Sequence, residues 1–478
     1  MSTPNILWIC VDQQRWDCLG YANQYPVKTP NIDRLAKGGV NLANSYCPIP
    51  VRCPSRQSML TGARSEKLGA LWNYNQKIPT GMLAADAYSW ARELHDQLGY
   101  HTGWVGAWEG GYNATPASMG YDVYVPRSEI VRPMAENYPH CVPTNGFWGQ
   151  VYDMDKEYAP THQTAKQVGA LIDSWQDEHP WLIQMEFTEP HLPCTPVKEF
   201  ADMYDPTEIP QWGGFEDTYE NKPYIQRQQR INWNTEDKSW EFFAPVVARY
   251  YAWVSQIDDA IGRVLDKLEA AGKLDDTVII YTSDHGDYCG DRRQMDKHYA
   301  MYEEITHIPH LWHCPARFAQ GLTSQAFNTN ALDIPATIMD LVGLQKPDSM
   351  VGKSLLPVLT GQSETHRDAV MVTYNGQQFG LFSQRMLRMG DIKYTWNLTD
   401  TDELYDLAND PYELHNVIAD PTYAEVLQKM RHRLLAELQA EDDCMLNGWT
   451  IQQLQNGRKL GCYAVFRGYL SVRSQCTR

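Results

Sequence analysis

The sequence predicts an α/β fold: a large mixed, mostly parallel sheet sandwiched by helices, with a smaller C-terminal subdomain of antiparallel strands and one helix. Residues 6–11, 181–187 and 277–282 form continuous apolar runs, which are typical of parallel strands buried on both faces. Helical patterns at residues 161–175 and 245–271 alternate with these runs. Such alternation indicates a parallel sheet with helices on both sides.

The character of the chain changes near residue 365. Short strand-like runs follow one another at residues 369–374, 380–389 and 392–396, and a helical pattern covers residues 423–441. Consecutive short strands without intervening helices favour an antiparallel sheet. This region is therefore expected to form a small sheet with one helix.

These patterns divide the chain into three parts. We predict a catalytic body at residues 1–365, a subdomain at residues 366–445 and an extension at residues 446–478. The extension is basic, and we interpret it as a surface arm that packs on the body or on a second subunit. Its cations are Arg458, Lys459, Arg467, Arg473 and Arg478.

Composition excludes several classes of protein. The formal net charge of the 478 residues is −18, which argues against broad nucleic-acid binding. No run of 18 apolar residues indicates a membrane span, and the N-terminal residues carry no secretion signal. The eleven cysteines show no disulfide spacing, as in a reduced protein. We expect a cytoplasmic protein without membrane partners.

Three polar side chains follow two of the predicted strands. Asp12 comes directly after the first strand, and Asp284 and His285 come after a later one. Because ligands of such sheets bind at the carboxyl ends of the strands, these side chains are expected to meet.

Residues 50–62 read Pro-Val-Arg-Cys-Pro-Ser-Arg-Gln-Ser-Met-Leu-Thr-Gly. This segment resembles the signature of the sulfatase family of the alkaline phosphatase superfamily, Cys-x-Pro-Ser-Arg continuing to Leu-Thr-Gly. In that family the cysteine is converted to formylglycine, which attacks the sulfate ester. Alignment of Pro54, Ser55 and Arg56 puts Arg52 in the place of the nucleophile, and Cys53 falls one position late. The chain therefore resembles a divergent sulfatase without formylglycine.

The resemblance continues along most of the chain. Segments similar to the family's strands, metal-binding turns and C-terminal subdomain lie at residues 4–14, 29–36, 101–106, 189–193, 281–287 and 403–413. The metal ligands implied by the resemblance are Asp12, Gln13, Asp284 and His285. Because Gln13 stands where an Asp is common, this set is poorer for Ca²⁺ and better for Mn²⁺ or Zn²⁺, and an empty site stays open as an alternative.

The resemblance also implies a set of catalytic residues. Arg56, His191 and Lys297 are retained, and in the family they hold the formylglycine, the leaving oxygen and the sulfate. With Arg52 they form our predicted catalytic set. Arg cannot act as a nucleophile, because it stays protonated.

Other positions depart from the family. Ala107-Trp108-Glu109 replaces Lys-Trp-His, and Arg292 stands where relatives have a His. We assign Trp108, Glu109 and Arg292 to substrate binding. Arg52 would repel a metal ion beside it, so it could take the ion's place by pairing with Asp12, Asp284 or Glu109.

Three functions remain open. The first is an enzyme acting on an anionic substrate, a sulfated or uronic-acid carbohydrate, by water-mediated ester hydrolysis or by β-elimination. The second is a conventional sulfatase or phosphodiesterase with Cys53 as the modified nucleophile. The third is a non-catalytic protein that binds anions. The expected partner is an anionic small molecule or oligosaccharide, and a homo-oligomer is left open.

Overall fold

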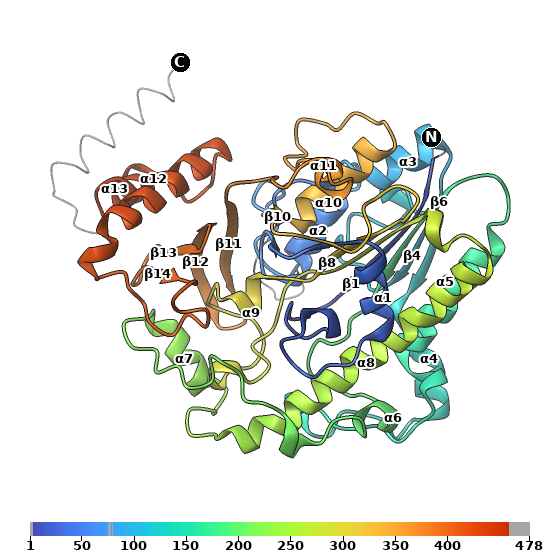
Figure 1. Cartoon of the computed structure of the whole chain (residues 1–478), viewed down its shortest axis with the longest axis horizontal. Coiled ribbons are helices and arrows are strands. Elements are labelled where there is room, and N and C mark those ends of the chain that lie inside the picture. The colour runs from blue at the N-terminus through green and yellow to red at the C-terminus, as the bar shows by residue number, and fades with distance from the viewer. Residues whose placement is uncertain (1–2, 75–77, 79, 458–478) are drawn as a thin grey trace.

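The computed structural model describes residues 3–74, 78 and 80–457. Its central sheet has the strand order β5-β4-β6-β1-β7-β8-β2-β9 (Figure 1). The paired strands run parallel except at β8, which is antiparallel to both of its neighbours. The strands of this sheet are β1 (Asn5–Val11), β2 (Val40–Leu42), β4 (His101–Gly106), β5 (Val123–Pro126), β6 (Trp181–Glu186), β7 (Thr277–Ser283), β8 (His310–His313) and β9 (Leu322–Ser324). The predicted mixed, mostly parallel sheet is confirmed.

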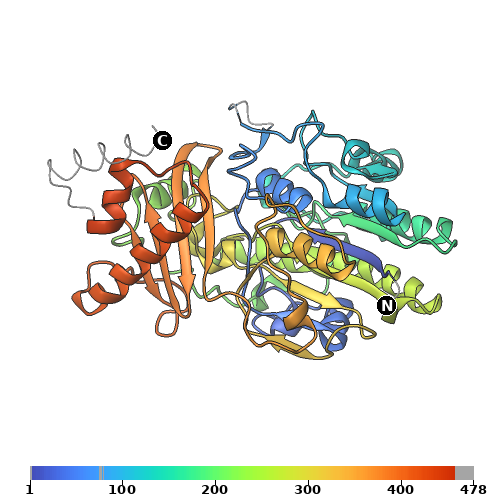
Figure 2. The same ribbon diagram turned by 90° about the horizontal axis from the view of Figure 1, so that it is seen from above.

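Helices cover both faces of this sheet (Figure 2). Leu7, Ile9 and Val11 of β1 pack into the core beneath one helical layer, which includes α5 and α8. The alternate residues of β1 pack into a second core with α2, α3 and α10. Burial on both faces is the reason that β1 is continuously apolar. The helices of the body are α1 (Pro30–Gly38), α2 (Arg52–Thr61), α3 (Trp90–Leu98), α4 (Arg127–Asn137), α5 (Pro160–Ser174), α6 (Lys198–Ala201), α7 (Tyr224–Asn232), α8 (Trp240–Ala270), α9 (Glu303–Thr306), α10 (Asn330–Leu341) and α11 (Leu356–Leu359).

Helix α8 begins before the residue predicted from the sequence. The pattern predicted a start at Pro245, whereas the helix starts at Trp240 and contains Pro245. A proline near the start of a long helix forfeits one backbone hydrogen bond, and burial of Phe243 and Ala244 in the core offsets that loss.

The C-terminal subdomain is an antiparallel sheet of four strands in the order β11-β12-β13-β14. Its elements are β11 (Val370–Gln377), β12 (Gly380–Met389), β13 (Ile392–Asn397), β14 (Glu403–Asp406), α12 (Ala424–Ala440) and α13 (Gly448–Asn456), and a short pair, β3 (Ser45–Tyr46) with β10 (Asn328–Thr329), lies in the body. Helices α12 and α13 pack on one face of the sheet. The predicted antiparallel sheet with a helix is confirmed, and α13, which was not foreseen, lies in the predicted extension. The five cations of the predicted extension lie outside the described residues.

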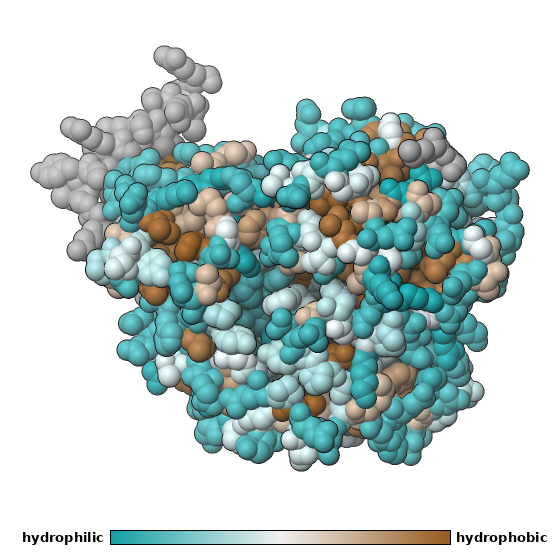
Figure 3. Space-filling view, viewed as in Figure 1, coloured by the Kyte–Doolittle hydropathy of each residue, from teal (hydrophilic) through white to brown (hydrophobic). Residues whose placement is uncertain are grey.

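The face in Figure 3 is mainly hydrophilic, with scattered apolar residues. Among the described residues, nine cysteines are free thiols, and no helix is long and apolar enough to cross a membrane.

Arg292 links the body to the C-terminal subdomain. Its side chain is about 1% exposed, its Nε donates to Glu304 at 2.5 Å, and it forms an ion pair with Asp217. A second terminal nitrogen donates to the carbonyl of Tyr412 at 2.7 Å, and the guanidinium stacks on Tyr302 with its carbon 3.6 Å from the ring centroid. Because the guanidinium is buried and each of its three nitrogens has a partner, the structure supports a structural role for Arg292.

We predict that Arg292→Ala destabilises the fold by about 3–5 kcal/mol, because it leaves the buried Glu304 carboxylate without its cation and Asp217 with Lys222 alone. Urea denaturation measures this loss. The exposed Arg34 is the matched control, and Arg34→Ala should change stability by less than about 1 kcal/mol. Unchanged stability with a raised KM would instead favour the substrate-binding role predicted from the sequence.

Candidate active site

Three buried carboxylates meet at the carboxyl ends of neighbouring strands. Asp12 follows β1, Glu186 ends β6 and Asp284 follows β7, and β1 lies between the other two strands in the sheet. All three side chains are buried. Carboxylates out of contact with water require cations or hydrogen-bond donors, so this edge of the sheet demands positive charge.

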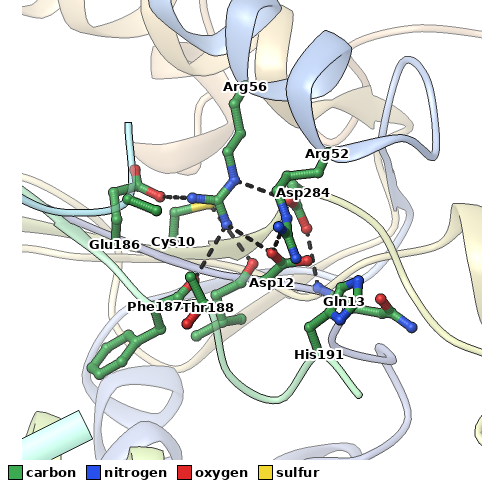
Figure 4. Close-up of polar contacts among 12 residues, drawn as sticks. Cys10, Asp12, Gln13, Arg52, Arg56, Glu186, Phe187, Thr188, His191 and Asp284 are labelled. Atoms are coloured by element: carbon green, nitrogen blue, oxygen red, sulfur yellow. Dashed lines mark hydrogen bonds and ion pairs between the residues drawn. The ribbon is translucent and has the colours of Figure 1, made fainter. Parts of the chain in front are cut away.

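Helix α2 supplies two cations to this edge. Arg52 is its first residue and Arg56 lies four residues later, so both side chains project from one face of the helix. Figure 4 shows the two guanidinium groups extending from α2 towards the acids at the strand ends. The Ser55 hydroxyl donates to the carbonyl of Asp284 at 3.0 Å and fastens the helix to β7.

Arg56 lies inside the cluster rather than at its surface. Its Nε donates to Asp284 at 2.9 Å, one terminal nitrogen pairs with Glu186, and the other donates to the carbonyl of Phe187 at 3.3 Å. Burial raises the pKa of Glu186 to about 7 although Arg56 opposes this. With its nitrogens directed at protein atoms, Arg56 positions the strand ends. Direct contact of Arg56 with a substrate stays a prediction.

Arg52 is the more accessible cation. Its side chain is 24% exposed, its Nε pairs with Asp12, and a terminal nitrogen lies 3.9 Å from an oxygen of Glu109. Burial lowers the pKa of Arg52, but Asp12 and Glu109 outweigh that effect and hold it above its usual value. Arg52 is therefore a permanent cation that faces both the cluster and the solvent.

Cys53 points away from the acids. Successive residues of a helix differ by roughly 100° in direction. The Cys53 thiol accordingly donates to Oε2 of Glu109 at 3.0 Å. Burial and the neighbouring Glu109 raise the pKa of Cys53 well above its usual value, so the sulfur keeps its proton. A protonated thiol is a poor nucleophile.

Asp12, Asp284 and His285 offer ligand atoms that lie within 4.8 Å of one another. Nε2 of His285 lies 3.8 Å from Asp12 and 3.7 Å from Asp284, and neither this nitrogen nor the Asp12 oxygens have a hydrogen-bond partner. Burial lowers the pKa of His285 to about 3, so its imidazole is neutral. Nδ1 lies 3.0 Å from the carbonyl of Gly286, which fits a proton on Nδ1 and a lone pair on Nε2.

These three groups fit a divalent ion with nitrogen and oxygen ligands, as Mn²⁺ or Zn²⁺ prefers. Two carboxylates and the lone pair of a neutral imidazole that point towards one another are stabilised by a cation between them. Arg52 supplies part of that charge at Asp12. The fourth predicted ligand, Gln13, turns its Oε1 to Lys297 instead.

Lys297 and His191 form the other side of the site. The Lys297 ammonium lies 2.9 Å from Oε1 of Gln13, 3.1 Å from Nε2 of His191 and 3.1 Å from Asp296. Burial and the Lys297 charge hold the pKa of His191 well below its usual value. Neutral His191 can thus accept a hydrogen bond from Lys297.

Trp108 lies next to the cluster, as its place beside Glu109 in the chain requires. Its indole Nε1 donates to the carbonyl of Ala114 at 2.8 Å, and its ring packs against Trp104 and Tyr124. Arg292, by contrast, contacts residues of the body and of the C-terminal subdomain and joins these two parts of the protein. The structure therefore brings together all the predicted site residues except Arg292, whose contacts lie elsewhere.

Sequence reasoning missed Glu186, Asp296 and Gln378. Glu186 is the last residue of an apolar strand, and this position is the only feature of the sequence that could have identified it. Asp296 contacts Lys297, and the Gln378 amide from the β11–β12 turn donates to Asp296 at 2.6 Å. The C-terminal subdomain thus reaches the site, which no local pattern indicated.

A comparison with protein families identifies the class of this protein. The model described as Sulfatase matches residues 4–344, and the chain therefore belongs to the sulfatase family. A model described as the C-terminal region of N-sulphoglucosamine sulphohydrolase matches residues 290–441.

Individual relatives agree with this assignment. An arylsulfatase of Clostridium perfringens is 28% identical, over 93% of this chain and 96% of its own. An N-acetylglucosamine-6-O-sulfatase of Bacteroides thetaiotaomicron is 25% identical, over 92% of this chain and 86% of its own. A protein solved in complex with its substrate D-glucosamine-2-N,6-O-disulfate shares the fold, with a TM-score of 0.76 at 22% identity over 93% of this chain and 99% of the other.

We predict that Cys53 is an unmodified thiol, because its motif is out of register and its side chain faces Glu109 rather than Asp12. Peptide mass spectrometry over residues 50–62 should find the mass of cysteine. A loss corresponding to an aldehyde at Cys53 would refute the alignment that places Arg52 at the nucleophile's position.

We also predict that Arg52 competes with a divalent ion for Asp12. Calorimetric titration with Mn²⁺ should show about tenfold tighter binding by Arg52→Ala than by the natural protein, equivalent to roughly 1.4 kcal/mol. Because the pKa of His285 is about 3, its protonation should not weaken binding between about pH 5 and 8, unlike that of an ordinary histidine. Asp12→Asn should abolish binding in both backgrounds, and equal affinity with and without Arg52 would refute competition.

Proposed function

We propose that this protein hydrolyses sulfate esters of a carbohydrate without formylglycine, using water as the nucleophile. The observation that carries the proposal is the pairing of Arg52 with Asp12 at the position that the family gives to its nucleophile. An arginine there provides charge but no attacking atom. Lys297 and His191, which complete the anion-binding site, are the residues that the family has at these positions.

In this mechanism the sulfate lies between Arg52 and Lys297. Both are cations that can neutralise the charge of the ester oxygens. A water molecule attacks the sulfur and gives its proton to the free carboxylate oxygen of Asp12. The sulfur–oxygen bond to the sugar breaks, and Lys297 donates a proton to the leaving oxygen. The products are sulfate and a sugar hydroxyl, and both side chains regain their protonation states by exchange with solvent.

His191 and Glu186 support this arrangement. Neutral His191 orients the Lys297 ammonium through their 3.1 Å contact. Glu186 holds Arg56, which in turn holds Asp284. A divalent ion held by Asp12, Asp284 and His285 would supply Lewis acidity beside the sulfate, and it would compete with Arg52 and with the proton of the attacking water for Asp12.

The alternatives are less well supported. β-elimination requires a uronic-acid carboxylate, for which Arg52 is a suitable partner, but the relatives reported above carry the names of sulfatases. A conventional mechanism requires Cys53 to turn away from Glu109. A non-catalytic protein would keep anion binding and show no turnover.

We predict that Lys297→Gln lowers kcat/KM for a sulfated saccharide by about 10²-fold or more, because the leaving oxygen loses its proton donor. The glutamine keeps a hydrogen-bonding group near Gln13. Sulfate release from a panel of sulfated oligosaccharides, followed by ion chromatography, measures the effect alongside the melting temperature. The exposed Lys166 is the matched control, and Lys166→Gln should retain full activity.

Arg52→Cys provides the complementary test. Co-expressed with a formylglycine-generating enzyme, this variant should lose its native activity and gain no arylsulfatase activity, because Ala107 and Glu109 still replace the Lys and His of the family. Full native activity in Arg52→Cys would remove Arg52 from the mechanism. Saturable binding of sulfated saccharides without any sulfate release would favour the non-catalytic alternative.

A further inference from the structure

Four aromatic side chains form a group beside Glu109, which we call the aromatic rim: Tyr74, Trp108, Tyr112 and Tyr124. The ring centroids of Tyr74 and Tyr112 are 5.0 Å apart with the planes at 79°. Those of Trp108 and Tyr124 are 6.5 Å apart at 65°. The Tyr74 hydroxyl donates to the carbonyl of Trp108 at 3.4 Å and joins the two pairs.

Two of the four aromatic side chains of the rim are exposed to solvent. Tyr112 is 73% exposed and Tyr124 is 38% exposed, whereas Tyr74 and Trp108 are half-buried. Large aromatic side chains gain free energy from burial, so Tyr112 and Tyr124, each packed against a half-buried ring, offer apolar surface to a ligand. Trp108 is held by its hydrogen bond to Ala114, so part of the surface is fixed before any ligand arrives.

The rim is continuous with the anion-binding cluster. Glu109 follows Trp108 in the chain and contacts both Cys53 and Arg52. The Tyr74 hydroxyl donates to the backbone carbonyl of Trp108, which precedes Glu109 in the chain, and Tyr124 packs against the Trp108 ring. A ligand whose anionic group reaches Arg52 therefore carries its next atoms towards the rim.

Glu109 indicates the chemistry of that ligand. The Glu109 carboxylate is buried and accepts one hydrogen bond, from the Cys53 thiol, which is a weak donor. A guanidinium nitrogen of Arg52 lies 3.9 Å away. A carboxylate in this state gains from further donors. A sugar ring offers hydroxyl donors together with an apolar face of C–H groups, whereas an aryl ring offers an apolar face alone.

We propose that the aromatic rim is a saccharide subsite, in which Tyr112 and Tyr124 stack on pyranose rings and Glu109 accepts a sugar hydroxyl. This proposal rests on the proposed function, because the sulfate of the same substrate occupies the cluster of Arg52 and Lys297. The two tilted pairs of rings suit successive sugar units better than one flat ring. The protein is then selective for a sulfated oligosaccharide over a simple aryl sulfate.

Binding measurements on the full chain test the proposal. A panel of sulfated di- and tetrasaccharides from heparin, chondroitin and ulvan is titrated calorimetrically, with unsulfated counterparts, 4-nitrophenyl sulfate and inorganic sulfate in parallel. Tyr112→Ala should weaken binding of the preferred sulfated saccharide about tenfold and leave the affinity for inorganic sulfate unchanged. Tyr112→Phe keeps the ring and should bind as the natural protein does.

Tyr224 is the matched control, since it is 67% exposed and belongs to α7, outside the rim. Tyr224→Ala should not change saccharide affinity. Unchanged saccharide affinity in Tyr112→Ala and Tyr124→Ala, equal losses for saccharide and inorganic sulfate, or no saturable binding of any saccharide would each overturn the subsite. Saccharide binding that depends on the rim but not on Lys297, with no sulfate released, would uphold the subsite and refute the proposed function.

Discussion

The site depends on one buried interaction, the pairing of Arg56 with the carboxylates of Glu186 and Asp284. Glu186 and Asp284 lie at the ends of β6 and β7, and Asp12 lies at the end of β1 between them. Without a cation, these three buried carboxylates would repel one another. Arg56 neutralises part of this charge and docks α2 on the sheet edge. Once the helix is docked, the position of its first residue, Arg52, follows from helical geometry alone.

The placement of Arg52 changes the chemistry of its surroundings. A guanidinium beside Asp12 reduces the negative charge available to a metal ion, and Gln13 reduces it further. Next to Arg52 on α2, the Cys53 thiol donates to Glu109, and burial together with Glu109 raises the pKa of the thiol. Gln13 and Arg52 both make this edge of the sheet less negative, and the carboxylate of Glu109, 3.9 Å from Arg52, compensates part of that change.

Much of this arrangement follows from local patterns. The apolar runs predict the central strands, and the strand ends predict that Asp12, Asp284 and His285 meet. The C-terminal strands were equally visible in their short runs. The predicted starts of α5 and α12 lie within one residue of the observed ones, whereas α8 starts at Trp240 instead of Pro245, because tertiary burial of Phe243 extends that helix.

The sequence by itself determined the fold class and the convergence of Asp12, Asp284 and His285 at the sheet edge. These depend on periodicity and on spacing along one helix or strand. Only the tertiary structure decided that Arg292 joins the body to the subdomain, that Glu186 holds Arg56, and that Gln378 reaches Asp296. These contacts join side chains far apart in the chain or on separate elements, and a polar residue's partner depends on which distant group the packing brings within hydrogen-bonding distance.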